Sequence, residues 1–168
     1  MSDFIERKNE FRKEVRTNIN KLTAAQIKAS DEAITNQFIK YIRPNPGARI
    51  YAYVPYGKEI STLSLLSHFR RQGIYVTICW DWPMDRYPDP GDIIIVPGLT
   101  FDKNGYRIGK GGGFYDRLLA KAPMALSVGL ARDELLANEV PRENHDRRVD
   151  CIITETQIFD FPEYMNER

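Results

Sequence analysis

The sequence predicts an α/β protein with a layered, largely parallel β-sheet and helices on both faces. Short segments rich in β-branched residues alternate along the chain with segments whose apolar residues recur at helical spacing. Such alternation favours parallel strands joined by crossover helices, which cover both faces of the sheet. The 168 residues contain no internal repeat, low-complexity tract or evident linker. We therefore expect one domain that spans residues 1–168.

Two helices are expected before the first strand. Apolar residues recur at helical spacing over residues 3–22. A second helical pattern follows directly, because Thr23 and Gln26 have the spacing of a capping box. This second helix should stop before Pro44, which cannot continue a helix.

The rest of the chain reads as strands that alternate with shorter helices. Residues 49–54 are rich in β-branched and aromatic residues and predict a strand, and the apolar spacing from Leu63 predicts a helix with Ser61 as its possible cap. Residues 81–91 are rich in proline and predict a loop. The remaining expected elements are strands at 74–79, 92–96, 126–130 and 151–154 and a helix at 114–121.

Composition restricts the classes of partner. The chain has 24 Lys and Arg against 23 Asp and Glu, a formal net charge of +1, so no global field attracts nucleic acid. The N-terminal residues lack the apolar core of a secretory signal, and no apolar run approaches the roughly 20 residues that cross a bilayer. We expect a cytoplasmic monomer that acts on a small molecule and binds neither membranes nor nucleic acid.

A glycine-rich segment provides the clearest chemical signal. Four of the chain's 11 glycines fall between Gly109 and Gly113, directly before a predicted helix. Backbone N–H groups in such a turn can converge on a phosphate, and Arg107 and Lys110 add mobile cations. The spacing matches neither the Walker A loop nor the Rossmann fingerprint. A flexible turn with solvated charges is the alternative interpretation.

Basic residues on the first predicted helix extend this hypothesis. Lys8, Arg12 and Arg16 are spaced four residues apart and therefore lie on one stripe of the helix. The stripe can reach a phosphate at the edge of the sheet, although such residues are commonly a solvated helix face.

Carboxylates near the glycine-rich segment and near the last strand suggest a metal site. Asp116 opens the predicted helix, and Asp146 and Asp150 precede the last strand. Carboxylates beside a triphosphate commonly hold Mg²⁺ together with phosphate oxygens and water. Asp116 could instead be a first-turn acid that interacts favourably with the helix dipole.

Four ordered blocks of the sequence also carry a family resemblance. Residues 96–117 resemble the signature of the 5-formyltetrahydrofolate cyclo-ligases, also called methenyltetrahydrofolate synthetases. Residues 8–12 are similar to the family's N-terminal Lys-x-x-Leu-Arg, with Phe11 in the Leu place, and residues 58–62 resemble its Glu-hydrophobic-x-Thr segment. Residues 140–155 resemble its C-terminal block. The resemblance implies a Rossmann-like sheet of the NagB and cyclo-ligase type.

The resemblance also implies roles for individual residues. It implies that ATP and 5-formyltetrahydrofolate are converted to 5,10-methenyltetrahydrofolate, ADP and phosphate, with Mg²⁺ held by Asp116 and Asp146. Glu59 matches the family's folate-site acid near the reacting formyl group, and with Lys110 and Tyr115 it forms the implied catalytic set. The residues implied to bind the nucleotide are Lys8, Arg12, Arg107, Gly109, Lys110, Gly111, Gly112, Gly113, Phe114 and Tyr115.

The sequence departs from the family's pattern in the loop at residues 81–91, which is shorter than the family's usual segment. Trp80 directly precedes this loop and Trp82 lies within it. Both are expected to rebuild an apolar wall for the substrate, since flat rings stack well on a pterin. They could instead be core or loop anchors. A nucleotide-binding regulatory module that has lost folate chemistry is the alternative function.

Overall fold

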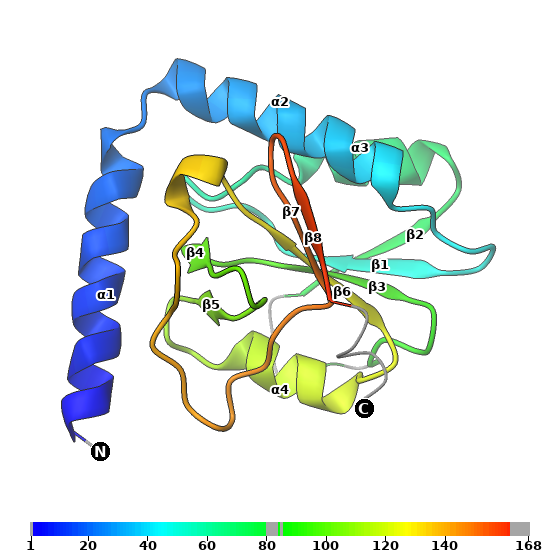
Figure 1. Ribbon diagram of the computed structural model, residues 1–168. Coiled ribbons are helices and arrows are strands. Elements are labelled where there is room, and N and C mark those ends of the chain that lie inside the picture. The colour runs from blue at the N-terminus through cyan, green and yellow to red at the C-terminus, as the bar shows by residue number, and fades with distance from the viewer. Residues whose placement is uncertain (1, 80–83, 85, 162–168) are drawn as a thin grey trace.

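The chain forms a central β-sheet with helices packed on both faces (Figure 1). The computed structural model describes residues 2–79, 84 and 86–161. Its helices are α1 (Ser2–Lys21), α2 (Ala24–Tyr41), α3 (Leu63–Arg71), α4 (Phe114–Lys121) and the 3₁₀ turn η1 (Asp133–Leu135). Its strands are β1 (Arg49–Ala52), β2 (Tyr75–Ile78), β3 (Ile93–Val96), β4 (Thr100–Phe101), β5 (Arg107–Ile108), β6 (Leu126–Leu130), β7 (Cys151–Ile153) and β8 (Ile158–Asp160).

The strand order creates a crevice at one end of the sheet. Six strands in the described residues lie in the order β2-β1-β3-β6-β7-β8, all parallel to their neighbours except β8, which is antiparallel to β7. The chain moves outward from β1 to β2 and then returns to place β3 on the other side of β1. In open α/β sheets, ligands bind beyond the carboxyl ends of the strands at such a switch point. The predicted fold class is therefore confirmed, and it predicts where a ligand binds.

The inner parallel strands β1, β3, β6 and β7 are buried on both faces, as a sheet sandwiched between helices requires, whereas the edge strand β2 is only partly covered. Along β3, Ile93 and Ile95 pack with apolar residues of α2 and α3, whereas Ile94 and Val96 pack on the opposite face with α4. All four β3 side chains are at most 2% exposed. These two cores hold the carboxyl ends of the strands in fixed positions.

Helix α1 lies apart from the two helix layers, beside the β4–β5 hairpin (Figure 1). The carbonyls at its C-terminal end accept hydrogen bonds from the ammonium group of Lys58, at 3.0 Å for Asn20 and 2.9 Å for Leu22. A cation at this position also interacts favourably with the helix dipole. No helix in the described part of the chain is long and apolar enough to cross a membrane.

Sequence patterns predicted the helices and strands correctly where the element was long enough to show a period or a complete capping motif. The capping box of α2 is present, because the side chains of Thr23 and Gln26 each accept a hydrogen bond from the other's backbone N–H. The expected cap Ser61 is wrong: the N-cap of α3 is Thr62, whose hydroxyl donates to the carbonyl of Tyr53 at 2.7 Å. Strands β4, β5 and β8 were not predicted, because two or three residues are too few to show a period.

Candidate functional site

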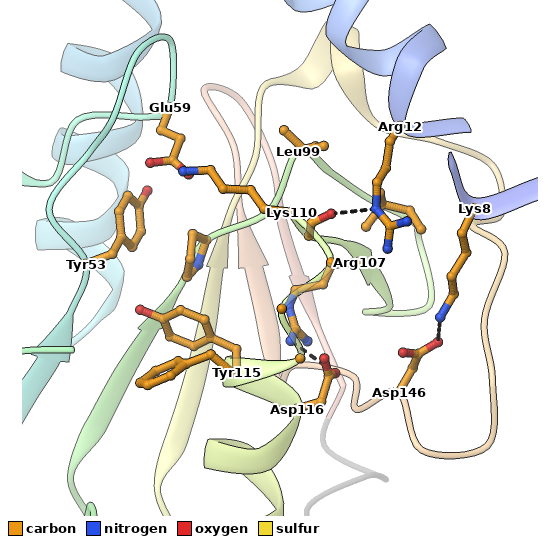
Figure 2. Close-up of a pocket in the computed structure, with 18 of the residues that line it drawn as sticks. Lys8, Arg12, Tyr53, Glu59, Leu99, Arg107, Lys110, Tyr115, Asp116 and Asp146 are labelled. Carbon is orange, nitrogen blue, oxygen red and sulfur yellow. Dashed lines mark hydrogen bonds and ion pairs between the residues drawn. The ribbon is translucent and has the colours of Figure 1, made fainter. Parts of the chain in front are cut away.

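A cavity of about 720 Å³ lies at the switch point (Figure 2). Tyr53, Cys79 and Pro97 line its floor, and each follows directly or closely after one of the strands β1, β2 and β3. The glycine-rich loop 109–113 and one side of α1 line its walls. The fold therefore brings together segments that are far apart in the sequence.

The glycine-rich loop presents backbone to this cavity. Gly111 and Gly113 have φ of 104° and 63°, in the left-handed region that favours glycine. A Cβ added at Gly109 or Gly112 would meet no described atom within 4 Å, so the space beside the loop is open. Gly113 is the N-cap of α4, and within the described residues no side chain caps this helix. The N-terminus of α4 therefore lines the cavity, where the helix dipole favours an anion.

Two basic residues of α1 reach the loop and the segment that precedes β7. The Nε of Arg12 donates to the carbonyl of Gly109 at 3.0 Å. The ammonium group of Lys8 donates to Glu143 Oε2 at 3.0 Å and to Asp146 Oδ2 at 2.5 Å, and Lys8 is only 7% exposed. The helix thus fastens two loops that both line the cavity (Figure 2).

A second ion pair holds the first turn of α4 in place. Arg107 donates to Asp116 Oδ1 at 3.0 Å and to the backbone carbonyl of Arg147 at 2.8 Å. The backbone N–H of Arg147 donates to the same oxygen of Asp116 at 3.0 Å. Sequence reasoning missed Arg147 and Glu143 as members of this site, because both contacts join segments at least 31 residues apart.

Asp116 and Asp146 both line the cavity, and carboxylates are the ligand type that Mg²⁺ takes beside a phosphate. The hydrogen bonds of Asp116 use Oδ1 and those of Asp146 use Oδ2, while Asp146 Oδ1 lies 3.8 Å from His145 Nε2. Among the described residues, no group of three or more His, Cys, Asp or Glu side chains could hold a metal alone. Mg²⁺ needs no such group, because it commonly takes one or two carboxylates together with phosphate oxygens and water.

Asp150, the third carboxylate considered from the sequence, lies away from this cavity. It is fully buried and accepts hydrogen bonds from the backbone N–H and the hydroxyl of Ser127, both at 2.7 Å. These contacts join the strands β6 and β7. Its role in the described fold is structural.

Glu59 and Lys110 form an ion pair at the upper edge of the cavity in Figure 2. The ammonium group of Lys110 lies 2.7 Å from Glu59 Oε1. Glu59 Oε2 accepts a hydrogen bond from the backbone N–H of Tyr56 at 2.8 Å, which fixes the carboxylate to its own turn. The turn itself is held by Arg132, which donates to the carbonyl of Lys58 at 3.2 Å.

The floor of the cavity is neutral. The hydroxyl of Tyr115 is buried and has no hydrogen-bond partner among the described residues. Burial raises the pKa of Tyr115 well above its usual value, so the hydroxyl keeps its proton and can donate it in a hydrogen bond. Burial likewise raises the pKa of the Cys79 thiol to about 12. Neither group adds negative charge where an anionic ligand would bind.

A second cavity of about 520 Å³ lies beside the first. Its wall is largely apolar. The sequence did not predict it, because its residues come from segments that are far apart in the chain: α1, the turn before α3, β4, β6 and η1. Its apolar lining includes Ile19, Ile60, Leu99, Phe101, Leu130 and Leu135. Trp80 and Trp82, expected to form an apolar wall, lie outside the described residues.

Comparisons with known proteins agree with the sequence resemblance. Residues 81–155 match the model of the 5-formyltetrahydrofolate cyclo-ligase family. The chain is 29% identical over 143 residues to a 5-formyltetrahydrofolate cyclo-ligase of Mycolicibacterium smegmatis, and the alignment covers 64% of this chain and 74% of that protein. A 5-formyltetrahydrofolate cyclo-ligase of Haemophilus influenzae is 27% identical, and the alignment covers 80% of this chain and 92% of that protein.

A solved structure shows the same fold. The NMR structure of Aquifex aeolicus 5,10-methenyltetrahydrofolate synthetase superimposes with a TM-score of 0.76 at 23% identity and covers 92% of each chain. The matched family segment contains the loop 109–113 together with Asp116 and Asp146, whereas Lys8, Arg12 and Glu59 lie outside it. The structure places these three side chains around the same cavity.

Proposed function

The chain belongs to the 5-formyltetrahydrofolate cyclo-ligase family, and on this premise we propose that it uses Mg·ATP to convert 5-formyltetrahydrofolate to 5,10-methenyltetrahydrofolate, ADP and phosphate. One observation carries the proposal. A single cavity at the switch point of the sheet gathers the glycine-rich loop, the cations of α1, the carboxylates Asp116 and Asp146, and Glu59. These groups match the parts that a phosphoryl transfer followed by ring closure requires.

The nucleotide phosphates are proposed to bind on the loop 109–113. The N-terminus of α4 faces the cavity with its favourable dipole, and Arg12 and Lys110 supply positive charge at the mouth of the loop. Lys8 and Arg107 hold Asp146 and Asp116 in place from the protein side. When bound, Mg²⁺ would be held by these two carboxylates and would neutralise charge on the transferred phosphoryl group.

The proposed chemistry starts at the formyl oxygen, which is a poor leaving group until it is phosphorylated. The γ-phosphoryl group passes to this oxygen, and N10 of the folate attacks the formyl carbon. The oxygen then departs as part of phosphate, which also takes the N10 proton. The product carries a positive charge over N5, the bridging carbon and N10. The carboxylate of Glu59 is suited to offset this charge, and the protonated hydroxyl of Tyr115 is a donor for a phosphate oxygen.

The proposal needs a site for the folate next to the nucleotide. The apolar cavity beside Glu59 satisfies this need, because its wall can cover a flat heterocycle and it shares Glu59 with the first cavity. Phosphoryl transfer and ring closure would then occur at the boundary between the two cavities. The protein's contribution is to position the two substrates and to exclude water from the reacting groups.

The experiment that tests this function mixes the purified chain with 5-formyltetrahydrofolate, Mg²⁺ and ATP. The expected result is methenyl absorbance that grows with time and stops when ATP or Mg²⁺ is omitted, with one ADP formed for each product. The alternative function, a regulatory module without folate chemistry, predicts nucleotide binding and no absorbance change. That second outcome would overturn the enzymatic proposal.

A further inference from the structure

The two cavities share a boundary that is closed by charged side chains. The first cavity is the polar one at the glycine-rich loop, and the second is the apolar one between α1 and η1. Four residues line both of them: Glu59, Gly98, Leu99 and Lys110. Two of the four are small or apolar, and the other two form the 2.7 Å ion pair. The ion pair therefore lies on the boundary between the nucleotide cavity and the folate cavity.

This ion pair prevents each partner from performing its proposed task. Lys110 is needed as a cation for phosphate, and Glu59 is needed as a carboxylate for the folate. While the ammonium lies on the carboxylate, their charges offset each other, and neither offers a full charge to a ligand. The pair must separate before the two substrates meet.

The two partners differ in their freedom to move. The side chain of Lys110 is 53% exposed, lies on the glycine-rich loop and covers the ring of the exposed Tyr56, with its Nζ 5.3 Å from the ring centroid. The side chain of Glu59 is 14% exposed and is held by the backbone N–H of Tyr56. Lys110 can therefore leave while Glu59 stays in place.

We propose that the Glu59–Lys110 ion pair is a latch that the nucleotide opens, so that 5-formyltetrahydrofolate binds more tightly after Mg·ATP has bound. This inference rests on the proposed function. The phosphates of the nucleotide carry several negative charges beside the same loop and attract the ammonium more strongly than one carboxylate does. Release of Lys110 leaves the carboxylate of Glu59 facing the second cavity, where polar N–H groups of the folate become its partners.

The latch predicts a coupling between the two binding equilibria. Each substrate raises the affinity for the other by the same factor, because coupling of binding free energies is reciprocal. A factor of about 5 or more is expected for wild type, at the lower end of common coupling factors. Removing the charge of Lys110 frees Glu59 permanently, so the folate affinity should no longer depend on the nucleotide.

Calorimetric titration of 5-formyltetrahydrofolate tests the latch, with and without saturating Mg²⁺ and an ATP analogue whose β,γ-bridge cannot be cleaved. The variants are Lys110→Gln and Glu59→Gln, with Lys13→Gln as the control, because Lys13 is an exposed cation of α1 outside both cavities. With the analogue, wild type and the control should bind the folate at least about fivefold more tightly. In Lys110→Gln and Glu59→Gln the analogue should change the folate affinity by less than about twofold. The analogue concentration used for Lys110→Gln is the one that saturates that variant.

Two outcomes would overturn the latch. In the first, the folate affinity of wild type is the same with and without the analogue. In the second, Lys110→Gln keeps the full wild-type increase in folate affinity. Both are distinguishable from failure of the proposed function. If wild type forms methenyl product but shows no coupling, the latch alone is wrong. If wild type forms no product and binds no folate under any condition, the proposed function and the latch fail together.

Discussion

Lys8 of α1 and Asp146, which lie 138 residues apart in the sequence, form an ion pair of 2.5 Å at the wall of the first cavity. Asp146 Oδ2 also accepts the backbone N–H of Glu143 at 2.7 Å, so one carboxylate joins the first helix to the turn before β7. The pair has a structural role and also determines where the proposed metal ligand lies.

Replacing Lys8 with Met should lower the free energy of unfolding by about 1–3 kcal/mol, because it leaves the partly buried Asp146 and Glu143 without their cation. Lys13→Met removes an exposed charge from the same helix and should change it by less than about 0.5 kcal/mol. Urea unfolding of both variants measures the difference. Equal losses would show that the Lys8 contacts contribute nothing specific.

Two glycines should respond to alanine in opposite ways. At Gly129 an added Cβ would lie 2.5 Å from the buried ring of Phe101, so Gly129→Ala should lower stability by about 1–3 kcal/mol. At Gly112 the added Cβ meets open space, so Gly112→Ala should fold normally. Its methyl group would project where the phosphates are proposed to bind and should weaken nucleotide binding on the order of 10-fold. A Gly112→Ala protein with wild-type nucleotide affinity would place the phosphates elsewhere.

Asp116→Asn and Asp146→Asn should each raise the Mg²⁺ concentration for half-maximal activity, on the order of 10-fold or more. The amide fills the same space and keeps an acceptor for Arg107 or Lys8, but it cannot offset the charge of the metal. Glu139→Gln, an exposed residue outside the cavity, is the matched control. The measurement is a Mg²⁺ titration of the initial rate. An unchanged titration for Asp146→Asn would mean that this carboxylate serves only Lys8.

The buried cysteines predict a loss of stability in alkali. Burial raises the pKa values of Cys79 and Cys151 from 9.0 to about 12. Their contribution is complete below about pH 9, where the thiols are protonated in both states. It is lost as the pH rises towards 12, because the unfolded thiols ionise first. The urea midpoint of wild type should therefore fall between pH 8 and pH 10.5, and the double variant Cys79→Ala, Cys151→Ala should lose less. A double variant with the full wild-type decrease would assign the effect to other groups.

Local patterns in the sequence were sufficient for much of the fold. The capping box at Thr23 and Gln26 could be predicted because it depends on neighbouring residues. The same holds for the helices and strands up to β7, apart from the short elements β4, β5 and η1. The choice of Thr62 over Ser61 as a cap could not, since it depends on a hydrogen bond to Tyr53, nine residues away. Strand β8, which pairs antiparallel with β7, could not be predicted because its three residues are too few to show a period.

The candidate site was predictable in its residue types more than in its contacts. The glycine-rich loop and Lys8 were singled out by spacing, and the structure places them around one cavity. The pairing of Lys8 with Glu143 and Asp146 depends on the packing of α1 against a distant turn, which no local pattern encodes. The same holds for the ion pair between Glu59 and Lys110, which joins a turn after β1 to the loop after the β4–β5 hairpin.

The central claim is that ATP activates the formyl oxygen so that it leaves as phosphate, and isotopic transfer tests this claim most directly. The substrate is 5-formyltetrahydrofolate with ¹⁸O in its formyl group, and the phosphate released with Mg·ATP is analysed by mass spectrometry. One ¹⁸O atom is expected in each phosphate formed together with methenyl product. Product accompanied by unlabelled phosphate would contradict the proposed activation, and a chain that binds the nucleotide but forms no product would contradict the function itself.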